Sequence, residues 1–250
     1  AAVESIHFLI PGGAGGGWDS TARGTGEALS KSGLVATISY ENMSGGGGGK
    51  AIAHLIETAL QKQDTLMVNS TPIVIRSLSK VFPQSFRDLT PIAATIGDFG
   101  AFVVKNDSQY TSFTQVVEDF KKDNRSVKIS GGSARGSMDH LVAAMAFKAA
   151  GGDPSKVRYV AYDAGGEAMA GLLSGETAVL STGFSEALTL AAAGEVRILA
   201  MTGDERNEAA PSVPTLKELG YNASFVNWRG FFAAPGISDT QKNEFIDSLE

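Results

Sequence analysis

The stretch "IPGGAGGGWDS", residues Ile10–Ser20, places five glycines within six positions, directly after an apolar segment. Each glycine loses more backbone freedom on folding than any other residue, so this density is costly. The preceding residues 5–10 are typical of a strand, and residues 18–31 are typical of a helix. We therefore interpret the stretch as the turn of a strand–turn–helix unit, with a backbone that a ligand can approach closely.

A second strand–turn–helix unit follows about half a chain later. "SVKIS" (Ser126–Ser130) predicts a strand, "GGSARGSMDH" (Gly131–His140) a glycine-rich turn, and the apolar residues after it a helix that ends at Gly151 and Gly152. The two units predict two similar α/β lobes, each with a helix N-terminus at the carboxyl edge of its sheet. A crevice between two lobes is a common place for a ligand.

Strand and helix patterns alternate along the rest of the chain, which favours an α/β protein with a largely parallel sheet. We expect strands at 35–41, 66–69, 92–96, 101–104, 157–162, 177–182 and 196–202, and an extended segment at 225–235. We expect helices at 50–60, 72–80, 166–173, 186–193 and 238–250, and a short helix between prolines at 211–221.

The composition is that of an ordinary soluble globular chain, with 43% hydrophobic and 19% charged residues among 250. A net charge of −6 repels phosphate backbones, so nucleic acid is not expected as a partner. The lack of cysteine excludes thiol catalysis, disulfides and cysteine-ligated metals. Since no apolar run approaches the ~20 residues of a membrane-spanning helix, the chain is not expected to be membrane-embedded.

A glycine-rich turn that opens a helix can bind an anion without a lysine, because the first backbone N–H groups of a helix lack partners and carry partial positive charge. Two such turns facing each other would suit an anion charged at both ends. The helix dipole contributes only ~0.3–2 kcal/mol per turn, whereas micromolar binding requires ~8 kcal/mol. Charge-assisted hydrogen bonds of ~1.5–3 kcal/mol each must supply the rest. The alternative is that these glycines only form tight turns.

The usual nucleotide-binding motifs are missing. In "SGGGGGKA" (Ser44–Ala51), Ser44 stands where a P-loop requires glycine, and Ala51 where it requires serine or threonine. No segment fits G-x-G-x-x-G. A nucleotide cofactor is therefore not expected.

Catalytic patterns are equally weak. The three histidines, His7, His54 and His140, have no metal-binding spacing, so no metal site is expected. "GFSEA" (Gly183–Ala187) approaches the nucleophile elbow of hydrolases but ends in Ala187 instead of glycine. We expect no catalytic residue and no cofactor, and keep as an alternative an α/β hydrolase that uses Ser133 or Ser185.

Side chains near the turns are binding candidates, each with an ordinary alternative. Asp19 and Asp139 lie early in helices, where a carboxylate can cap backbone N–H groups or bind ligand hydroxyls. Arg135 could pair a ligand carboxylate in a fork, and Arg229 could do the same or form an ion pair between lobes. The candidate aromatic walls, with ordinary packing as the alternative, are Trp18, Tyr162 and Trp228.

The order of these motifs resembles the extracytoplasmic solute receptors of tripartite tricarboxylate transporters, the TctC-like group of the Bug family. The resemblance covers nearly the whole chain, and its most specific parts are the block Val157–Glu186 and "RGFFAAP". It implies a two-lobed periplasmic binding protein fold of type II-like organisation, with a ligand cleft between two α/β domains. Lobe 1 would comprise 1–98 and 231–250, lobe 2 would comprise 99–230, and the hinge would lie near 97–101 and 227–230.

The resemblance also implies a ligand, and no enzymatic activity. The ligand would be a small organic carboxylate: citrate, another di- or tricarboxylate, or an aromatic acid. Lobe 1 would bind it through Ala14, Gly15, Gly16, Gly17, Trp18, Asp19, Ser44, Gly45, Gly46, Asn69 and Thr71. Lobe 2 would bind it through Ser133, Arg135, Gly136, Ser137, Tyr162, Gly165, Ser181 and Gly183.

Partners and location follow from the same resemblance. The protein would be a monomer, exported to the periplasm with its signal peptide removed, and the opening "AAVES" suits such a mature end. It would deliver its ligand to two integral membrane subunits. Since members of the family usually continue beyond the position of Glu250, we expect a shortened chain. A sensor that passes a ligand signal to a membrane kinase is a further alternative.

Overall fold

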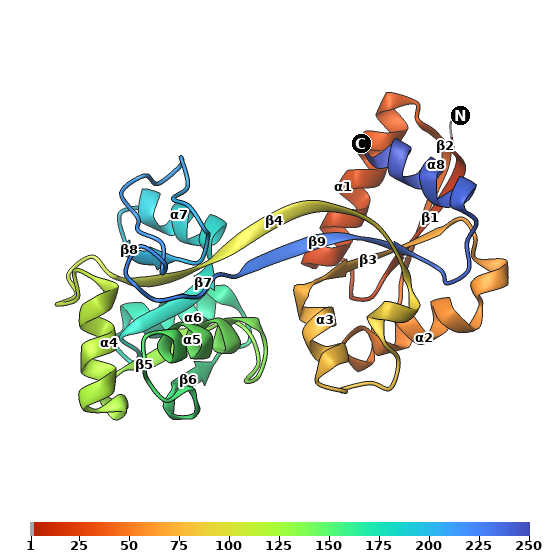
Figure 1. Ribbon diagram of the computed structural model, residues 1–250. Coiled ribbons are helices and arrows are strands. Elements are labelled where there is room, and N and C mark those ends of the chain that lie inside the picture. The colour runs from red at the N-terminus through yellow and green to blue at the C-terminus, as the bar shows by residue number, and fades with distance from the viewer. Residues whose placement is uncertain (1–2) are drawn as a thin grey trace. The chain divides into compact units, whose positions relative to one another are not determined.

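The computed structural model describes residues 3–250, apart from the side chain of Ile96. The chain divides into two compact units. Unit 1 contains residues up to Gly97 together with Trp228–Glu250, and unit 2 contains Asp98–Asn227. The chain passes from one unit to the other in two neighbouring strands, β4 (Thr90–Lys105) and β9 (Val226–Ala233) (Figure 1).

Unit 1 is built on a sheet with the strand order β2-β1-β3-β9. Strands β1 (Val3–Ile10), β2 (Val35–Asn42) and β3 (Thr65–Ser70) are parallel, and β9 is antiparallel to β3. Parallel strands end at the same edge of a sheet, and one helix begins after each of these three ends. The helices of unit 1 are α1 (Gly17–Ser32), α2 (Gly49–Glu57), α3 (Thr71–Leu78) and α8 (Asp239–Leu249), with single 3₁₀ turns at Gly46–Gly48, Ala59–Gln61 and Phe86–Asp88.

The core of unit 1 follows the two-residue period of its strands. Phe8 and Ile10 of β1 lie in one apolar cluster with residues of α1 and α8, while Leu9 lies in a second cluster with residues of α2 and α3. Strand β9 alternates in the same way, with Phe231 in the first cluster and Phe232 in the second. The sheet is therefore covered by helices on both faces, as Figure 1 shows.

Unit 2 repeats this organisation. Strands β5 (Lys128–Gly131), β6 (Arg158–Ala161) and β7 (Val179–Gly183) are parallel, in the order β7-β5-β6. Strand β4 is antiparallel both to β7 and to β8 (Val196–Met201). The helices are α4 (Phe113–Lys122), α5 (Met138–Ala149), α6 (Gly165–Leu173) and α7 (Phe184–Ala192), with single 3₁₀ turns at Asn124–Ser126 and Pro154–Lys156.

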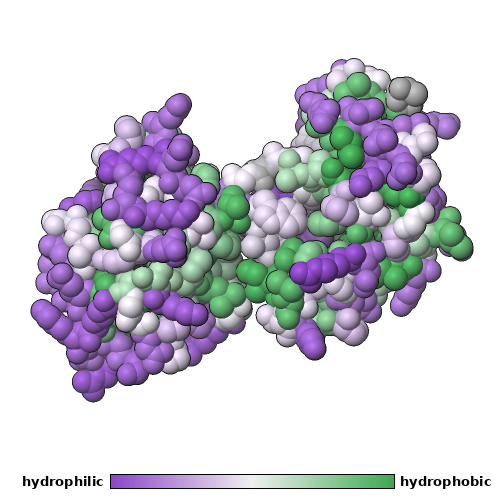
Figure 2. Space-filling model, viewed as in Figure 1, coloured by the Kyte–Doolittle hydropathy of each residue, from purple (hydrophilic) through white to green (hydrophobic). Residues whose placement is uncertain are grey.

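Two apolar clusters flank this second sheet. Phe102 and Ile129 pack with residues of α4 and α5, whereas Val103 and Leu180 pack with residues of α6 and α7. The face of unit 2 seen in Figure 2 is mostly hydrophilic, as expected when the apolar residues lie in these clusters. In the part of the chain that the structure describes, no helix has the length and apolar character needed to span a bilayer.

Two expected elements differ from the structure. The separate strands predicted at 92–96 and 101–104 are one continuous strand, β4. Gly100, between the two predicted segments, is a packing position in the strand: a β-carbon there would lie 3.0 Å from Val142 and 3.2 Å from Thr202. The glycine marks close contact between elements, not a turn.

The short helix predicted at 211–221 is wrong. This segment forms turns and an isolated parallel bridge between Met201 and Thr215. Glu218 accepts a hydrogen bond from the Thr215 backbone N–H at 2.8 Å, and the Leu216 N–H donates to the Met201 carbonyl. The Leu216 bond ties the segment to β8, and both bonds use backbone N–H groups outside a helix.

Candidate functional site

The turn between β1 and α1, which we call turn 1 (Gly13–Gly16), is fixed by a backbone hydrogen bond from Gly16 N–H to the Gly13 carbonyl at 3.4 Å. Its third residue, Gly15, has a φ of 82°. A left-handed third residue is the requirement of a type II turn, and glycine meets it without steric cost. Of the glycines in this stretch, Gly15 is the one whose conformation requires glycine.

The turn between β5 and α5, turn 2 (Ala134–Ser137), has the same construction. The Ser137 N–H donates to the Ala134 carbonyl at 3.0 Å, and the third residue, Gly136, has a φ of 78°. The residue after each turn opens a helix, α1 or α5. Two units that share little sequence thus form one local structure at the carboxyl edge of their sheets.

The left-handed glycine of turn 1 donates its N–H to a carboxylate of the chain itself. Gly15 N–H lies 2.8 Å from Asp19 Oδ2, while Asp19 Oδ1 accepts from Arg23 at 2.9 Å and from Asn42 at 3.0 Å. The Gly15 hydrogen bond, followed by that from Asn42, lowers the pKa of Asp19. Asn42 also donates to the Gly12 carbonyl at 2.9 Å and so fixes the entry of the turn.

In turn 2 the corresponding acceptor is an imidazole. Gly136 N–H donates to His140 Nδ1 at 2.9 Å, so Nδ1 carries no proton and the imidazole is uncharged. Burial, and then the charge of Arg135, lower the pKa of His140. The ring stacks on Tyr159 with centroids 4.7 Å apart. Turn 1 therefore binds a negative side chain, and turn 2 a neutral one beside a cation.

The first turn of α5, which follows turn 2, carries a buried carboxylate, Asp139. Asp139 Oδ2 accepts a hydrogen bond from Ser133 Oγ at 2.8 Å, and the Asp139 carbonyl accepts one from Ser181 Oγ at 2.9 Å. Burial, which outweighs the Ser133 hydrogen bond, raises the pKa of Asp139 to about 6. Tyr159 also donates to the Ser133 carbonyl, at 2.6 Å. In this structure Ser133 and Ser181 hold the turn in place through their hydroxyl groups.

Six helices begin at the carboxyl ends of parallel strands, and in none of them does the N-cap side chain bond to the helix. Helices α4 and α8, by contrast, are capped by Ser112 and Ser238. A side-chain cap stabilises a helix by ~1 kcal/mol. Two of the six helices receive such a bond from a residue other than the N-cap: the Asp139 N–H of α5 donates to Ser133 Oγ, and the Ser185 N–H of α7 donates to Asp98 Oδ1. The uncapped N-cap residues are Gly16, Gly48 and Ser70 in unit 1, and Ser137, Ala164 and Gly183 in unit 2.

Around turn 1 the structure brings together part of the predicted site. Trp18 Nε1 donates to Ser70 Oγ at 2.9 Å, which joins the start of α1 to the start of α3. The Arg229 guanidinium lies against the start of α1, because a β-carbon on Gly17 would be 2.5 Å from its Nη2. Sequence reasoning missed Ser70 and Asn42, since single polar residues at strand ends give no distinctive pattern.

The other predicted residues of unit 1 lie at neighbouring strand ends. The side chain of Asn69 is fully buried; its Oδ1 accepts from the Ser70 N–H, while its Nδ2 has no partner among the described residues. Thr71 accepts a hydrogen bond from the Trp228 N–H at 3.2 Å. The residues of the glycine loop, Ser44, Gly45 and Gly46, are exposed.

The starts of α6 and α7 are surrounded by acidic side chains. A β-carbon on Gly165 would lie 2.6 Å from Glu186 Oε1, and one on Gly183 would lie 2.8 Å from Asp98 Oδ2. Tyr162 donates to Glu176 Oε2 at 2.7 Å. These two glycines are therefore packing positions for carboxylates of the chain.

The structure shows no catalytic arrangement at the two serines of the hydrolase alternative. Ser133 Oγ bonds to Asp139, and Ser185 Oγ donates to Asp98 Oδ1 at 3.0 Å. Neither has a histidine among its hydrogen-bond partners in residues 3–250, and a serine nucleophile needs such a base. The described part of the chain also contains no cluster of three metal-binding side chains.

A family model described as "Tripartite tricarboxylate transporter family receptor" matches residues 21–246. A relative from Pseudomonas sp. strain P51, described as the UPF0065 protein in the tcbD-tcbE intergenic region, is 27% identical over 236 residues, which are 92% of this chain and 68% of the relative. The chain spans about two thirds of the length of the curated relatives it matches, 68%, 61% and 67%.

Solved structures show the same fold. A TctC solute-binding protein from Polaromonas superposes with a TM-score of 0.85 at 22% identity, over 98% of this chain and 82% of that one. MatC from Rhodopseudomonas palustris, solved with bound malate, gives 0.74 at 20% identity, over 99% and 83%. The α/β fold of periplasmic solute-binding proteins that the sequence predicted is confirmed.

Proposed function

Because the chain belongs to the tripartite tricarboxylate transporter receptor family, we propose that it binds a small organic carboxylate and delivers it to integral membrane subunits. The observation that carries this proposal is the pair of matched turns, one in each unit, at the start of helices whose N-cap residues make no side-chain hydrogen bond to the helix. A helix N-terminus with accessible backbone N–H groups favours a carboxylate.

The charges at the turns support different roles for the two units. In turn 2, the Gly136 N–H donates to an uncharged imidazole, and the neighbouring Arg135 guanidinium can pair a ligand carboxylate. In turn 1, the Gly15 N–H already donates to the Asp19 carboxylate, which also pairs with Arg23, so the chain itself supplies a carboxylate to this turn. We propose that turn 2 binds the charged end of the ligand, and that the turn 1 region contacts hydroxyl groups or water. Malate, which MatC binds, has both kinds of group.

The remaining predictions complete the proposal. Lobe 1 would comprise residues 1–98 and 231–250, and lobe 2 would comprise residues 99–230. The hinge would lie near 97–101 and 227–230, where the chain passes from one lobe to the other. Ligand binding would favour a closed state only to the extent that the ligand binds that state better than the open one. The receptor would act as a monomer in the periplasm, after export, and citrate, other di- or tricarboxylates and aromatic acids are its candidate ligands.

Isothermal titration with malate, citrate, adipate and benzoate tests the proposal, with the uncharged dimethyl ester of malate as the matched negative control. We expect saturable binding of at least one acid and none of the ester. Arg135→Gln should weaken that binding about tenfold, in keeping with the loss of one charge-assisted hydrogen bond. Lys148→Gln, which removes an exposed charge on α5, should not change it. Absence of heat with every acid would reject the carboxylate receptor.

A further inference from the structure

A second candidate site lies on unit 2, along its edge strand. A cavity of about 590 Å³ is lined by residues of β5, β6 and the loops beside them. Five of its eleven lining residues are cationic, and a single one, Glu176, is acidic. The cations are Arg125, Lys128, Arg135, Lys156 and Arg158. This concentration of positive charge stands out in a chain with a net charge of −6.

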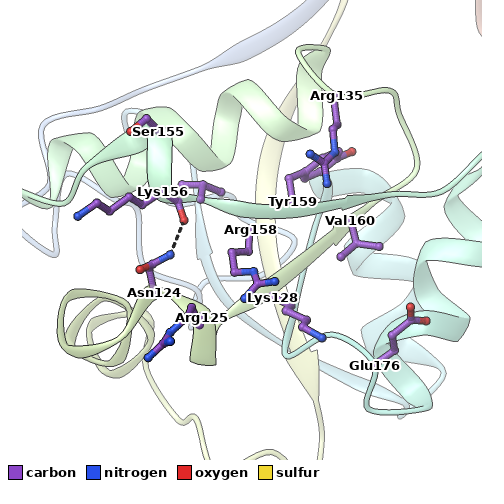
Figure 3. Close-up of a pocket in the computed structure, with 11 residues that line it drawn as sticks. Asn124, Arg125, Lys128, Arg135, Ser155, Lys156, Arg158, Tyr159, Val160 and Glu176 are labelled. Atoms are coloured by element: carbon purple, nitrogen blue, oxygen red, sulfur yellow. Dashed lines mark hydrogen bonds between the residues drawn. The ribbon is translucent and has the colours of Figure 1, made fainter.

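The central cations lie side by side on neighbouring strands. Lys128 of β5 is in register with Arg158 of β6, and both side chains are exposed (Figure 3). Arg135 extends from turn 2 to the same cavity, beside Tyr159. Like charges directly opposite each other on a sheet repel and are destabilising. An anion bound between them would remove this repulsion.

Most of these cations have no ion-pair partner of their own. Arg125 pairs with Asp123 at 2.9 Å, and that carboxylate also feels the charge of Arg158. No salt bridge joins Lys128, Arg135, Lys156 or Arg158 to an acidic group anywhere in residues 3–250. Glu176, the acidic lining residue, is hydrogen-bonded to Tyr162. The cavity therefore retains an excess of positive charge.

Protection of a sheet edge does not account for this cluster. Charged residues on an edge strand discourage pairing with other chains, and that would suffice for Lys156 and Arg158, on or beside the edge strand β6. Lys128, however, lies on the inner strand β5, and Arg135 comes from a turn. Cations from three separate segments line one cavity, as a ligand site requires.

We propose that this cavity binds a multivalent oxyanion, a polyphosphate or polycarboxylate group, at a site that adjoins turn 2 at Arg135 and whose other lining residues lie outside both turns. Guanidinium groups bind phosphate and carboxylate oxygens in a fork, and a lysine adds a mobile point charge. The volume lies within the range of small-molecule pockets, roughly 300–1,000 Å³. Excess charge of this size favours a ligand with several negative groups over a monovalent one. The inference does not depend on the identity of the transported solute.

Isothermal titration of the whole chain with tripolyphosphate and, separately, with butane-1,2,3,4-tetracarboxylate tests the site and distinguishes its two possible ligand groups, and neither anion is a candidate solute of the turns. The test variant is Lys128→Gln/Arg158→Gln, and the control is Arg87→Gln/Lys148→Gln, which removes the same charges from exposed positions outside the cavity. We expect one saturable site for at least one anion, weakened about tenfold or more in the test variant and unchanged in the control.

Melting temperatures measured without anion show whether each variant is folded. The test variant should melt at the same temperature or higher, because one repulsive pair has been removed. Equal weakening in the test and control variants would mean non-specific attraction to charge, and would overturn the proposal. So would the absence of saturable binding with both anions. Binding of malate should survive in the test variant, so failure of this site and failure of the proposed function are separable.

Discussion

Asp19 accepts a hydrogen bond from the backbone N–H of Gly15, four residues earlier, at 2.8 Å. In the second unit, His140 accepts the corresponding bond from Gly136 at 2.9 Å. The two turns share a backbone conformation but differ in the charge of the side chain bound to it. In each turn, one backbone N–H group is therefore occupied by a side chain of the helix that follows. This side chain is a carboxylate in turn 1 and an imidazole in turn 2, so the two turns differ as anion sites.

The Asp19 carboxylate should stabilise the fold in a pH-dependent way. Its pKa is lowered from 3.8, first by the Gly15 hydrogen bond, so its stabilising contribution is present above that pH and is lost as the pH falls through the lower, folded-state pKa. We expect Asp19→Asn to lower the melting temperature at pH 7, and the difference from the unmodified chain to shrink below about pH 4.

The control for Asp19→Asn is Glu27→Gln, which changes the same charge on the same helix at an exposed pair with Lys31. Such a pair contributes little. Melting curves at several pH values that show the same loss for both variants would contradict a specific role of Asp19 in turn 1.

Asp139 should show the opposite pH dependence. Its pKa is raised from 3.8 to about 6, chiefly by burial, so its contribution to stability is complete below about pH 4 and is lost as the pH rises through 6. Asp139→Asn removes the buried charge and can still accept the Ser133 hydrogen bond. We expect the variant to gain relative to the unmodified chain between pH 4 and 7, by up to ~3 kcal/mol.

Urea unfolding at four pH values between 4 and 7 measures the Asp139 effect. Asp153→Asn provides the comparison: it should lower the free energy of unfolding in this pH range, because hydrogen bonds from Ser155 stabilise the ionised carboxyl and lower its pKa. A constant difference between Asp139→Asn and the unmodified chain over this pH range would show that the Asp139 carboxyl does not titrate as proposed.

Much of the fold could be predicted from sequence, because most strands are short apolar segments and helices α1, α2 and α5 follow turns rich in glycine. The paired units around Gly15 and Gly136 indicated the α/β layers correctly, and the resemblance in Val157–Glu186 and "RGFFAAP" indicated the family. The errors came where long-range contacts decide the structure. A β-carbon on Gly100 would touch α5 and the residue that follows β8, and the 211–221 segment is held by bonds to β8. Neither contact is visible in a local pattern.

The position of the candidate site could be predicted from sequence, but the side chains that bind the N–H groups of its turns could not. The turns and their helices were predicted, whereas the occupants of their N–H groups, Asp19 and His140, depend on side-chain geometry. Arg135 was assigned to the ligand because it stands in turn 2. That it also lines a cavity with Lys128 depends on the register of β5 and β6, which no sequence pattern specifies.

The glycines of the two segments should differ in their tolerance of substitution. A β-carbon on Gly132 would lie 2.6 Å from the Gly165 backbone nitrogen, so backbone must move to admit it, whereas one on Gly13 would meet nothing within 4 Å. We expect Gly132→Ala to destabilise unit 2 by ~1–3 kcal/mol and Gly13→Ala to change stability by less than ~0.5 kcal/mol. Urea unfolding of both variants measures this, and equal losses would show that glycine density alone sets the cost.

Gly136→Val should weaken ligand binding more than Arg158→Ala. A β-carbon on Gly136 would meet nothing within 4 Å, so steric filling of the turn is not the cause. The cause is instead the φ of 78°, which costs a non-glycine residue ~1–3 kcal/mol. Relief of this strain would turn the Gly136 N–H away from His140 and disorder turn 2.

Titration with the best-binding acid should show a loss of about tenfold for Gly136→Val. Gly136→Asn should retain more affinity, because asparagine tolerates this conformation, and Arg158→Ala should match the unmodified chain. Equal affinities for Gly136→Val and Arg158→Ala would remove turn 2 from the solute site.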